Sequence, residues 1–365
     1  MTSEANNRGA FRIQEHYCRT NASPIYADIC RALAERLTRD TRTGARVLDW
    51  PGEPTRDALP LRLIGGLHAL VLAGKDDALA AIFSGATDDP AEIAAGLLGV
   101  LARHDDALLP WLDGPPQTNE PGRSGALIVG LIEVARRFGP RLEILEIGSS
   151  AGLNLLIDRY RFDLGGTVFG PDSPVTIAPE WRGPPPEAPP LAVVSTRGCD
   201  VAPMDAADPA VEARLAAYVW AETPERRARL QRAIGMIRQR PVQLDRADAA
   251  DWIESRLAEP QPEGVTRVLM HSVVWQYLPQ ATAARIRAAM ETAGGRATLD
   301  RPLAWVSMEP DRALAHQVVR VRSWPGGAPP EVVATAHAHG TWVRPGAPDT
   351  AEAAIALPDA AKIEI

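Results

Sequence analysis

An acidic residue and two glycines stand close together near the middle of the chain, between Glu146 and Gly152. Gly148 and Gly152 permit a backbone path that a Cβ atom would block, so the chain can turn tightly or lie close to a ligand there. Residues 142–147 before them are mostly apolar, which is typical of a strand covered on both faces. The segment therefore predicts a buried strand, a tight turn beside a carboxylate, and a helix that runs to about residue 160.

This turn has two interpretations. Many α/β proteins contain a strand, a glycine turn and a helix that bind nothing, and the glycines then serve packing alone. If the turn binds a cofactor, the contacts come from its backbone and small polar side chains, in Glu146, Gly148, Ser149, Ser150, Gly152 and Asn154. A nicotinamide dinucleotide fits poorly, because its pyrophosphate requires Gly-x-Gly-x-x-Gly at a helix N-terminus.

Further polar residues follow the later predicted strands, at 191–195, 241–245, 265–270 and 303–309. Asp200 follows the second strand, and a carboxylate there offers two acceptor oxygens to the hydroxyls of a ribose. The other candidates at these strand ends are Asp248, Ala249, His271, Ser272, Tyr277 and Glu309. Because parallel strands end at one edge of a sheet, we expect these residues to lie near the first turn.

Strands that alternate with helices in this order predict an α/β fold, a Rossmann-like doubly wound sheet. A final antiparallel pair is expected at 317–324 and 331–337. Residues 1–125 show helical spacing without strand alternation and predict an N-terminal helical domain that acts as a lid or binds substrate. The sheet domain then covers 126–365, with an irregular insertion at about 161–190 that serves as a functional lid or a plain surface loop.

A polar segment at 115–124 precedes a predicted helix at 124–138. It is either a solvated linker or a segment that closes over the cofactor and offers Gln117, Asn119 or Arg123 to it. The helix before the first strand of a doubly wound fold begins near the ligand edge, so we expect these three side chains close to the bound nucleoside. The N-terminal region would then exclude water from the site.

The amino-acid composition restricts the classes of partner that we expect. The net charge is −7 and nothing indicates a basic groove, so nucleic acid is not an expected partner. No apolar stretch suits a signal peptide or a membrane span, so we expect a cytoplasmic protein that does not bind membranes. The cysteines are not spaced for zinc, and His337 and His339 lack a clear third ligand, so no metal site is expected. The oligomeric state stays open.

An acid at a strand end followed by Gly-x-x-x-Gly resembles the first motif of the class I S-adenosylmethionine-dependent methyltransferases. The resemblance implies that the turn lies beneath the methionine part of the cofactor, and that Asp248 accepts a hydrogen bond from the adenine amino group, with Ala249 beside the ring. Ser150 stands where the methyltransferase motif usually has its middle glycine. The segment 271–279 resembles the one that brings polar residues to the methyl-transfer site.

Four motifs together resemble one bacterial family, a domain of unknown function (number twenty-three thirty-two), from about Phe11 to Val343. They are Pro-Gln-Thr-Asn-Glu at 116–120, Leu-Glu-Ile-Gly-Ser-Ser-Ala-Gly-Leu-Asn-Leu at 145–155, Arg-Gly-Cys-Asp at 197–200 and His-Ser-Val-Val-Trp-Gln-Tyr-Leu-Pro at 271–279. This resemblance implies a methyltransferase-like core and no established reaction.

The expected function is methylation of an oxygen or nitrogen atom of a small molecule by S-adenosylmethionine. The sulfonium activates the methyl group, so the enzyme chiefly positions the nucleophile. His271 is the natural base, with Tyr277 and Glu309 behind it, although it could equally be a buried strand-end histidine whose hydrogen bonds are satisfied. Two alternatives remain: an enzyme that uses the cofactor for cyclisation or aminocarboxypropyl transfer, and a nucleoside-binding protein without catalysis.

Overall fold

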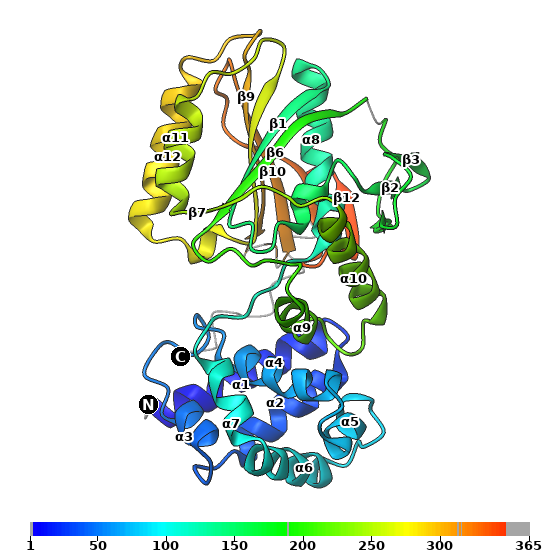
Figure 1. The fold of residues 1–365 in the computed structure, drawn as a ribbon, viewed down its shortest axis with the longest axis vertical. Helices are drawn as coiled ribbons and strands as arrows, with labels where there is room; N and C mark the ends of the chain where they lie inside the picture. The colour runs from blue at the N-terminus through cyan, green and yellow to red at the C-terminus, as the bar shows by residue number, and fades with distance from the viewer. Residues whose placement is uncertain (1–2, 188–189, 312–313, 315, 348–365) are drawn as a thin grey trace. The chain divides into compact units, whose positions relative to one another are not determined.

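A computed structural model describes residues 3–187, 190–311, 314 and 316–347. The chain divides into two compact units (Figure 1). The first comprises Met1–Thr118 and Asp208–Ala228, and the second comprises Asn119–Ala207 and Arg229–Ile365. The first unit therefore consists of two separate stretches of the sequence, with about ninety residues of the second unit between them.

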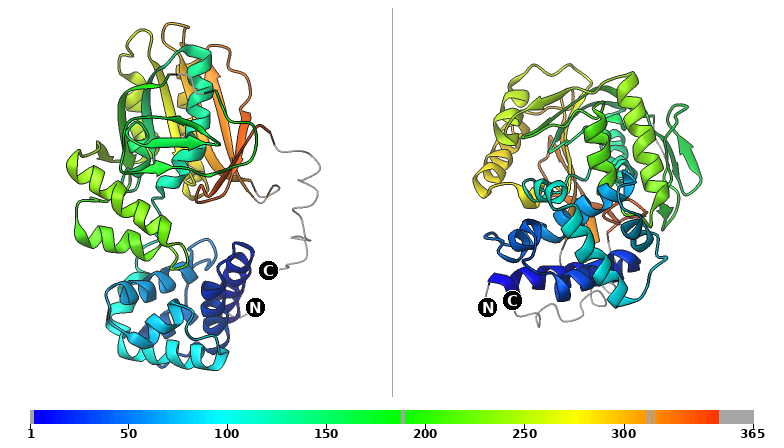
Figure 2. Two further views of the ribbon diagram at one scale, coloured as in Figure 1. Left: turned by 90° about the vertical axis from the view of Figure 1, so that its right-hand side faces the viewer. Right: turned by 60° about the horizontal axis from the view of Figure 1, so that its bottom comes forward.

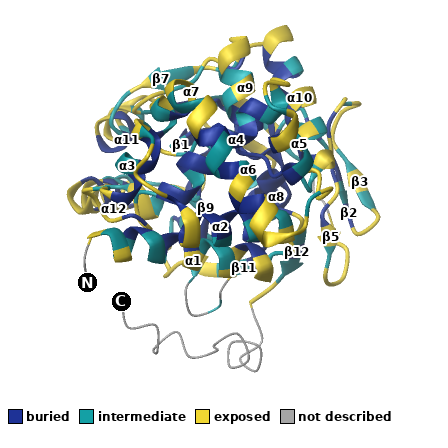
Figure 3. Ribbon diagram, turned by 90° about the horizontal axis from the view of Figure 1, so that it is seen from below, coloured by how far each residue is buried: buried dark blue, intermediate teal, exposed yellow. Residues whose placement is uncertain are grey.

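The first unit is helical. Its helices are α1 (Ser3–Thr20), α2 (Pro24–Arg36), α3 (Arg42–Leu48), α4 (Leu59–Leu72), α5 (Asp77–Phe83), α6 (Pro90–Arg103), α7 (Asp105–Leu108) and α9 (Pro209–Ala217). Side-chain oxygens of Thr41, Asp76 and Asp89 accept the first free N–H groups of α3, α5 and α6. Helix α4 is buried over most of its length (Figure 3), and its neighbours pack around it.

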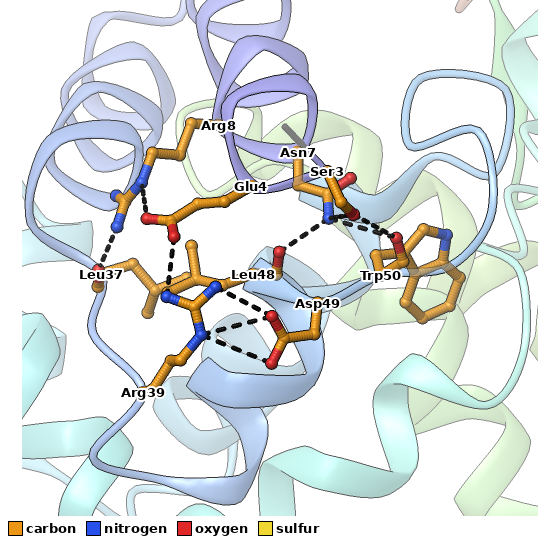
Figure 4. A network of polar contacts seen from close by, with 9 residues as sticks. All are labelled: Ser3, Glu4, Asn7, Arg8, Leu37, Arg39, Leu48, Asp49 and Trp50. Atoms are coloured by element: carbon orange, nitrogen blue, oxygen red, sulfur yellow. Dashed lines mark hydrogen bonds and ion pairs between the residues drawn. The ribbon is translucent and has the colours of Figure 1, made fainter. Parts of the chain in front are cut away.

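Polar side chains fix α1 to the segment around α3 (Figure 4). The Asn7 amide donates to the carbonyl oxygens of Leu48 at 3.0 Å and Trp50 at 3.2 Å. Arg8 donates to Leu37 O at 2.7 Å, and Glu4 accepts from both Arg8 and Arg39. These bonds satisfy carbonyl groups at helix ends, where the helices themselves offer no partner.

The second unit is built on a nine-stranded sheet in the order β5-β12-β11-β10-β9-β8-β1-β6-β7. The strands are β1 (Arg141–Ile147), β5 (Glu180–Trp181), β6 (Ala192–Asp200), β7 (Leu244–Arg246), β8 (Thr266–Ser272), β9 (Leu303–Asp311), β10 (His316–Trp324), β11 (Glu331–Ala336) and β12 (Trp342–Pro345). The five strands from β7 to β9 pair in parallel, whereas β9 to β12 pair antiparallel. The predicted α/β class, the five parallel strands and the final antiparallel pair are confirmed.

Helices cover both faces of this sheet. Helix α8 (Ser124–Phe138) packs on β9, β10 and β11, and Gly130 lets it approach closely, because a Cβ there would lie 2.5 Å from a methyl group of Val306. On the other face α11 (Ala249–Ala258) and α12 (Gln280–Gly294) pack together over β1, β6 and β8 (Figure 1). Helix α10 (Pro224–Gln239) precedes β7 in the chain.

The sequence predicted a helix directly after the first strand, and this prediction is wrong. Only a short 3-10 helix, η3 (Leu153–Leu156), follows β1, and all four of its residues are buried. The carbonyl oxygen of Leu153 accepts from the Tyr160 hydroxyl at 2.7 Å instead of from the next helical turn. The backbone bonds of this segment span three residues, from the Leu155 N–H to Gly152 O at 3.1 Å and from the Ile157 N–H to Asn154 O at 3.2 Å, as in a 3-10 helix.

The region at 161–190, predicted as irregular, contains ordered strands. A small sheet forms from β2 (Arg161–Leu164), β3 (Thr167–Phe169) and β4 (Thr176–Ile177), and the β2–β3 hairpin projects from the unit in two views (Figures 1 and 2). Gly165 and Gly166 form its two-residue turn, both with positive φ. Strand β5 joins the edge of the main sheet beside β12.

Among the described helices, none combines the length and the apolar character that crossing a bilayer requires.

Candidate functional site

The candidate site lies where the chain changes direction across the sheet. From β1 the chain moves to β6 and β7 on one side, and then returns to β8 on the other side of β1. In open α/β sheets such a point leaves a crevice outside the carboxyl ends of the strands, where ligands bind. The turn after β1 therefore occupies the position that the fold favours for a ligand.

The turn has a strained backbone. Gly148, Ser150 and Gly152 all have positive φ, at 66°, 54° and 78°. Ser150 lacks the freedom of glycine, and a non-glycine residue in this region costs of order 1–3 kcal/mol. Such strain persists only where surrounding contacts fix the conformation, and here the Asp200 carboxylate supplies one of them.

Asp200 ends β6 and links the two strands at their edge. Its Oδ2 accepts the Ser150 N–H at 2.9 Å and its Oδ1 accepts the Ala202 N–H at 2.9 Å. Each carboxylate oxygen can accept a second hydrogen bond. The half-buried Asp200 therefore both fixes the turn and keeps acceptor capacity for a ligand.

Glu146 is the buried acid of the site. It is 2% exposed, and within the described part of the chain its Oε2 atom is buried and has no hydrogen-bond partner. Burial, with a smaller contribution from the nearby negative charge of Asp200, raises the pKa of Glu146 to about 8, although Ser149, Arg123 and Asn154 act to lower it. At neutral pH this carboxyl group is mostly protonated and uncharged.

The polar segment before α8 is ordered and packs against the turn. Asn119 Oδ1 accepts the Leu153 N–H at 2.8 Å, and the Ser124 hydroxyl donates to Asn154 Oδ1 at 3.0 Å. Arg123 Nε donates to the carbonyl oxygen of Ala338 at 3.0 Å. The structure thus brings Asn119, Arg123 and Asn154 together with Glu146 in the second unit.

Gln117 lies in the first unit, so the expected approach of its side chain to the turn stays a prediction. A salt bridge that was not predicted from the sequence holds the segment that follows Gln117. Arg229 on α10 contacts the buried Glu120 at 3.0 Å. Glu120 also accepts the Gly122 N–H at 2.9 Å. No periodicity or motif indicated this pair, because its members are more than one hundred residues apart.

Both glycines of the turn contact apolar side chains. A Cβ on Gly148 would lie 2.3 Å from a methyl group of Val274, and one on Gly152 would lie 2.7 Å from a methyl group of Val242. Val274 belongs to the loop after β8 and therefore covers the turn directly. The packing interpretation accounts for both glycines, and a ligand above Gly148 would share that space with Val274.

Asp248 and Ala249 lie at the start of α11. Asp248 Oδ1 accepts the N–H groups of Ala250 at 2.8 Å and Asp251 at 3.2 Å, so Asp248 is the N-cap of this helix. Its Oδ2 has only a long contact, 3.4 Å, with the Thr282 hydroxyl. This second oxygen can accept a ligand donor without loss of the cap.

His271 and Glu309 form a buried pair at the ends of β8 and β9. The Trp305 indole N–H donates to His271 Nε2 at 2.9 Å, and His271 Nδ1 lies 2.6 Å from Glu309 Oε1. An indole nitrogen only donates, so Nε2 accepts and the proton is on Nδ1, which donates to Glu309. Both ring nitrogens are engaged, and His271 could accept a substrate proton at Nε2 only if the Trp305 bond opened.

Glu309 also fixes the loop after β8. Its Oε1 accepts the backbone N–H groups of Val274 at 3.0 Å and Trp275 at 3.2 Å. Val273, just before them, has a φ of 53°, which is rare for a β-branched residue. Ser272 is buried at the end of β8, whereas Tyr277 is 64% exposed. Glu309 therefore holds His271 and this loop in one arrangement.

A cavity of about 300 Å³ adjoins this pair. His271, Trp275 and Glu309 line it together with Trp305 and Ser307 of β9. Trp305 and Ser307 were not among the residues predicted from the sequence. The sequence contained the information needed to predict them, because residues 305, 307 and 309 occupy alternate positions of one strand and therefore share one face of the sheet.

Among the described residues, no cluster of histidine, cysteine and acidic side chains is arranged to hold a metal ion. The rings of His337 and His339 lie 5.3 Å apart, and the Nδ1 atom of His337 accepts the His339 N–H at 3.2 Å. Their arrangement is that of a local turn between β11 and β12.

Comparison with known proteins supplies a family and no activity. Neither the curated proteins nor the solved structures include a match. A family model with the description "Uncharacterized protein conserved in bacteria (DUF2332)" matches residues 8–344. Since this match covers nearly the whole chain, the protein belongs to this uncharacterized bacterial family.

Proposed function

We propose that the protein is an S-adenosylmethionine-dependent methyltransferase that acts on a small molecule. One observation carries the proposal: two acids, Glu146 and Asp200, meet a turn of positive φ at the point where the strand order reverses. The order of the five parallel strands, third-second-first-fourth-fifth, is compatible with a class I methyltransferase core. The combination suits a cofactor that carries a ribose and a cationic amino acid part.

The residues present fit such a cofactor. The free acceptor capacity of Asp200 suits two ribose hydroxyls, and Oδ2 of Asp248 suits the adenine amino group with Ala249 beside the ring. The Oε2 atom of Glu146, which has no partner among the described residues, suits the ammonium group of the methionine part. An ammonium group there would favour loss of the Glu146 proton.

The same geometry disfavours a dinucleotide. Helix N-termini bind pyrophosphate through free N–H groups and a favourable dipole. Here only the short η3 follows the turn, and Asn119 already accepts the Leu153 N–H. The carboxylate of Asp200 would also repel a pyrophosphate, which makes a cationic ligand the better fit.

The cofactor, when bound, supplies an activated methyl group. The chain then has to place an oxygen or nitrogen nucleophile in line with it and keep water out. His271 and Glu309 position Trp305 and the loop at 273–275, which adjoins the turn through Val274. Proton removal by His271 would require opening of the Trp305–His271 hydrogen bond.

Titration calorimetry tests the proposal. S-adenosylmethionine and S-adenosylhomocysteine are titrated separately into the full chain, with NAD as the control ligand. We expect binding of at least one of the first two and none of NAD. Absence of heat with both nucleosides, in protein whose circular dichroism and thermal transition show a folded state, would refute the proposal.

One observation favours a second candidate, a nucleoside-binding protein without catalysis. Val274 covers Gly148, where the methionine part of the cofactor would lie. Incubation with methyl-labelled cofactor and a bacterial metabolite extract separates the two functions. Labelled small-molecule product supports transfer, whereas tight binding with no label transferred supports the binding protein. Transfer of the aminocarboxypropyl group would appear as product labelled only when that part of the cofactor carries the label.

A further inference from the structure

The cavity beside His271 is built by one face of the antiparallel part of the sheet. Trp305, Ser307 and Glu309 alternate along β9, and in the register of β10 Arg320 stands opposite Ser307 and Arg322 opposite Trp305. All five side chains therefore share one face of the sheet. Arg287 and Glu291 of α12 complete the opposite wall.

Two of the three arginines in the cavity are neutralised. Arg322 forms an ion pair with Glu291, and Arg320 contacts Asp311 at 2.7 Å. Glu309 accepts three hydrogen bonds on Oε1 from uncharged donors, and its Oε2 atom has no partner among the described residues. Arg287 differs, since it has no carboxylate partner within the described ranges and its guanidinium lies 4.8 Å from the centre of the Trp275 ring. Among the arginines that line the cavity, Arg287 is therefore the one available to an anionic group of a ligand.

Aromatic rings form the wall beneath this charge. The Trp275 and Trp305 rings lie 5.3 Å apart at 57°, and His271 stacks on Trp275 at 5.3 Å. Such a surface favours a flat ring, which stacks or meets an edge. The Ser307 hydroxyl lines the same space and has no hydrogen-bond partner among the residues described, so it is available to a polar group of a ligand.

We propose that this cavity binds a planar aromatic carboxylate, with the ring on Trp275 and Trp305 and the carboxylate on Arg287. A volume of about 300 Å³ accommodates a molecule of one or two fused rings.

That this ligand is the methyl acceptor rests on the proposed function. Trp275 lines the cavity, and Val274, the preceding residue, covers Gly148 of the turn after β1. Two adjacent residues of this loop, Val274 and Trp275, therefore connect the turn and the cavity. A ring bound on Trp275 would place its substituents close to that loop.

The test uses benzoate, 2-naphthoate and indole-3-carboxylate, titrated into the full chain without nucleoside and followed by tryptophan fluorescence and calorimetry. We expect at least one of them to bind with a Kd below about 1 mM, and its neutral amide to bind about tenfold more weakly. Arg287→Ala should weaken binding of the carboxylate about tenfold and leave binding of the amide unchanged.

Arg285→Ala is the matched control. It removes an exposed arginine from the same helix, which pairs with Asp251 and Glu254 and does not line the cavity. Its affinity for the carboxylate should stay within twofold. Absence of binding by all three carboxylates, or equal loss in both variants, overturns the proposal. Because no nucleoside is present, a negative cofactor titration would refute the methyltransferase and leave this site standing, and the reverse also holds.

Discussion

Replacement of Glu146 by glutamine should stabilise the protein more as the pH rises. The amide keeps the size of the protonated carboxyl group but cannot ionise. Burial raises the pKa of Glu146 from the ordinary 4.5 to about 8, so the folded protein holds a proton that the unfolded chain releases between these values. The contribution of this group to stability is present below pH 4.5 and is lost as the pH rises toward 8.

The size of the effect follows from the same two pKa values. At 1.36 kcal/mol per pH unit, the loss caused by Glu146 is about 1 kcal/mol at pH 5.5 and about 4 kcal/mol at pH 7.5. The advantage of Glu146→Gln over the natural protein should therefore grow by about 3 kcal/mol between these pH values. Other titrating groups cancel in the difference, because both proteins contain them.

Urea unfolding at pH 5.5, 6.5 and 7.5 measures this difference. Glu180→Gln, which changes an exposed glutamate on β5, is the control: its hydrogen bond with Arg182 lowers the pKa of Glu180, so it is ionised in both states across this pH range and the difference should not vary with pH. A constant difference for Glu146→Gln as well would refute the reasoning. It would mean that Arg123, Ser149 and Asn154 together outweigh burial and keep the carboxylate ionised in the folded state.

Three further predictions concern the same edge of the sheet. Asp200→Ala should weaken S-adenosylmethionine binding at least about tenfold in calorimetry, since two charge-assisted hydrogen bonds are lost, and unchanged affinity would assign the ribose to another acid. Gly148→Ala should cost about 2–4 kcal/mol in urea unfolding, against about 1 kcal/mol for Gly264→Ala, because φ is 66° and 67° at these positions but only the first added Cβ would lie closer than 3 Å to another atom. Equal costs would show that contact with Val274 does not contribute. Hydrogen exchange should show cofactor protection at 115–124 as well as at 146–154, and protection of the second segment alone would leave the first as a plain linker.

Local pattern was sufficient to predict the main elements of the sheet unit. Helix α8 begins at Ser124 and ends at Phe138 as expected, because Gly139-Pro140 ends an apolar helical pattern. The buried strand before Glu146 was equally clear, since its near-continuous apolar run suits a central parallel strand. In both cases the determining information lies within a few residues.

Long-range contacts explain what the sequence did not reveal. No local signal shows that Asn119 and Tyr160 engage the backbone of Leu153 and that a 3-10 helix replaces the expected helix. The site shows the same limit: His271 was found by its place at a strand end, but its engagement by Trp305 depends on the pairing of two strands. The Gly165-Gly166 hairpin was a local signal that could have been recognised.

The division of the first unit into two stretches has a consequence for biosynthesis. The His68 imidazole donates to the carbonyl oxygen of Ala217, and the Tyr26 hydroxyl accepts the Ala221 N–H, so residues beyond position 208 complete the helical unit. A ribosome that adds 5–20 residues per second needs roughly 5 to 20 seconds to extend the chain from residue 118 to 228. For that time His68 and Tyr26 lack these partners and bond to water, and the helical unit is completed only when the second stretch has been made.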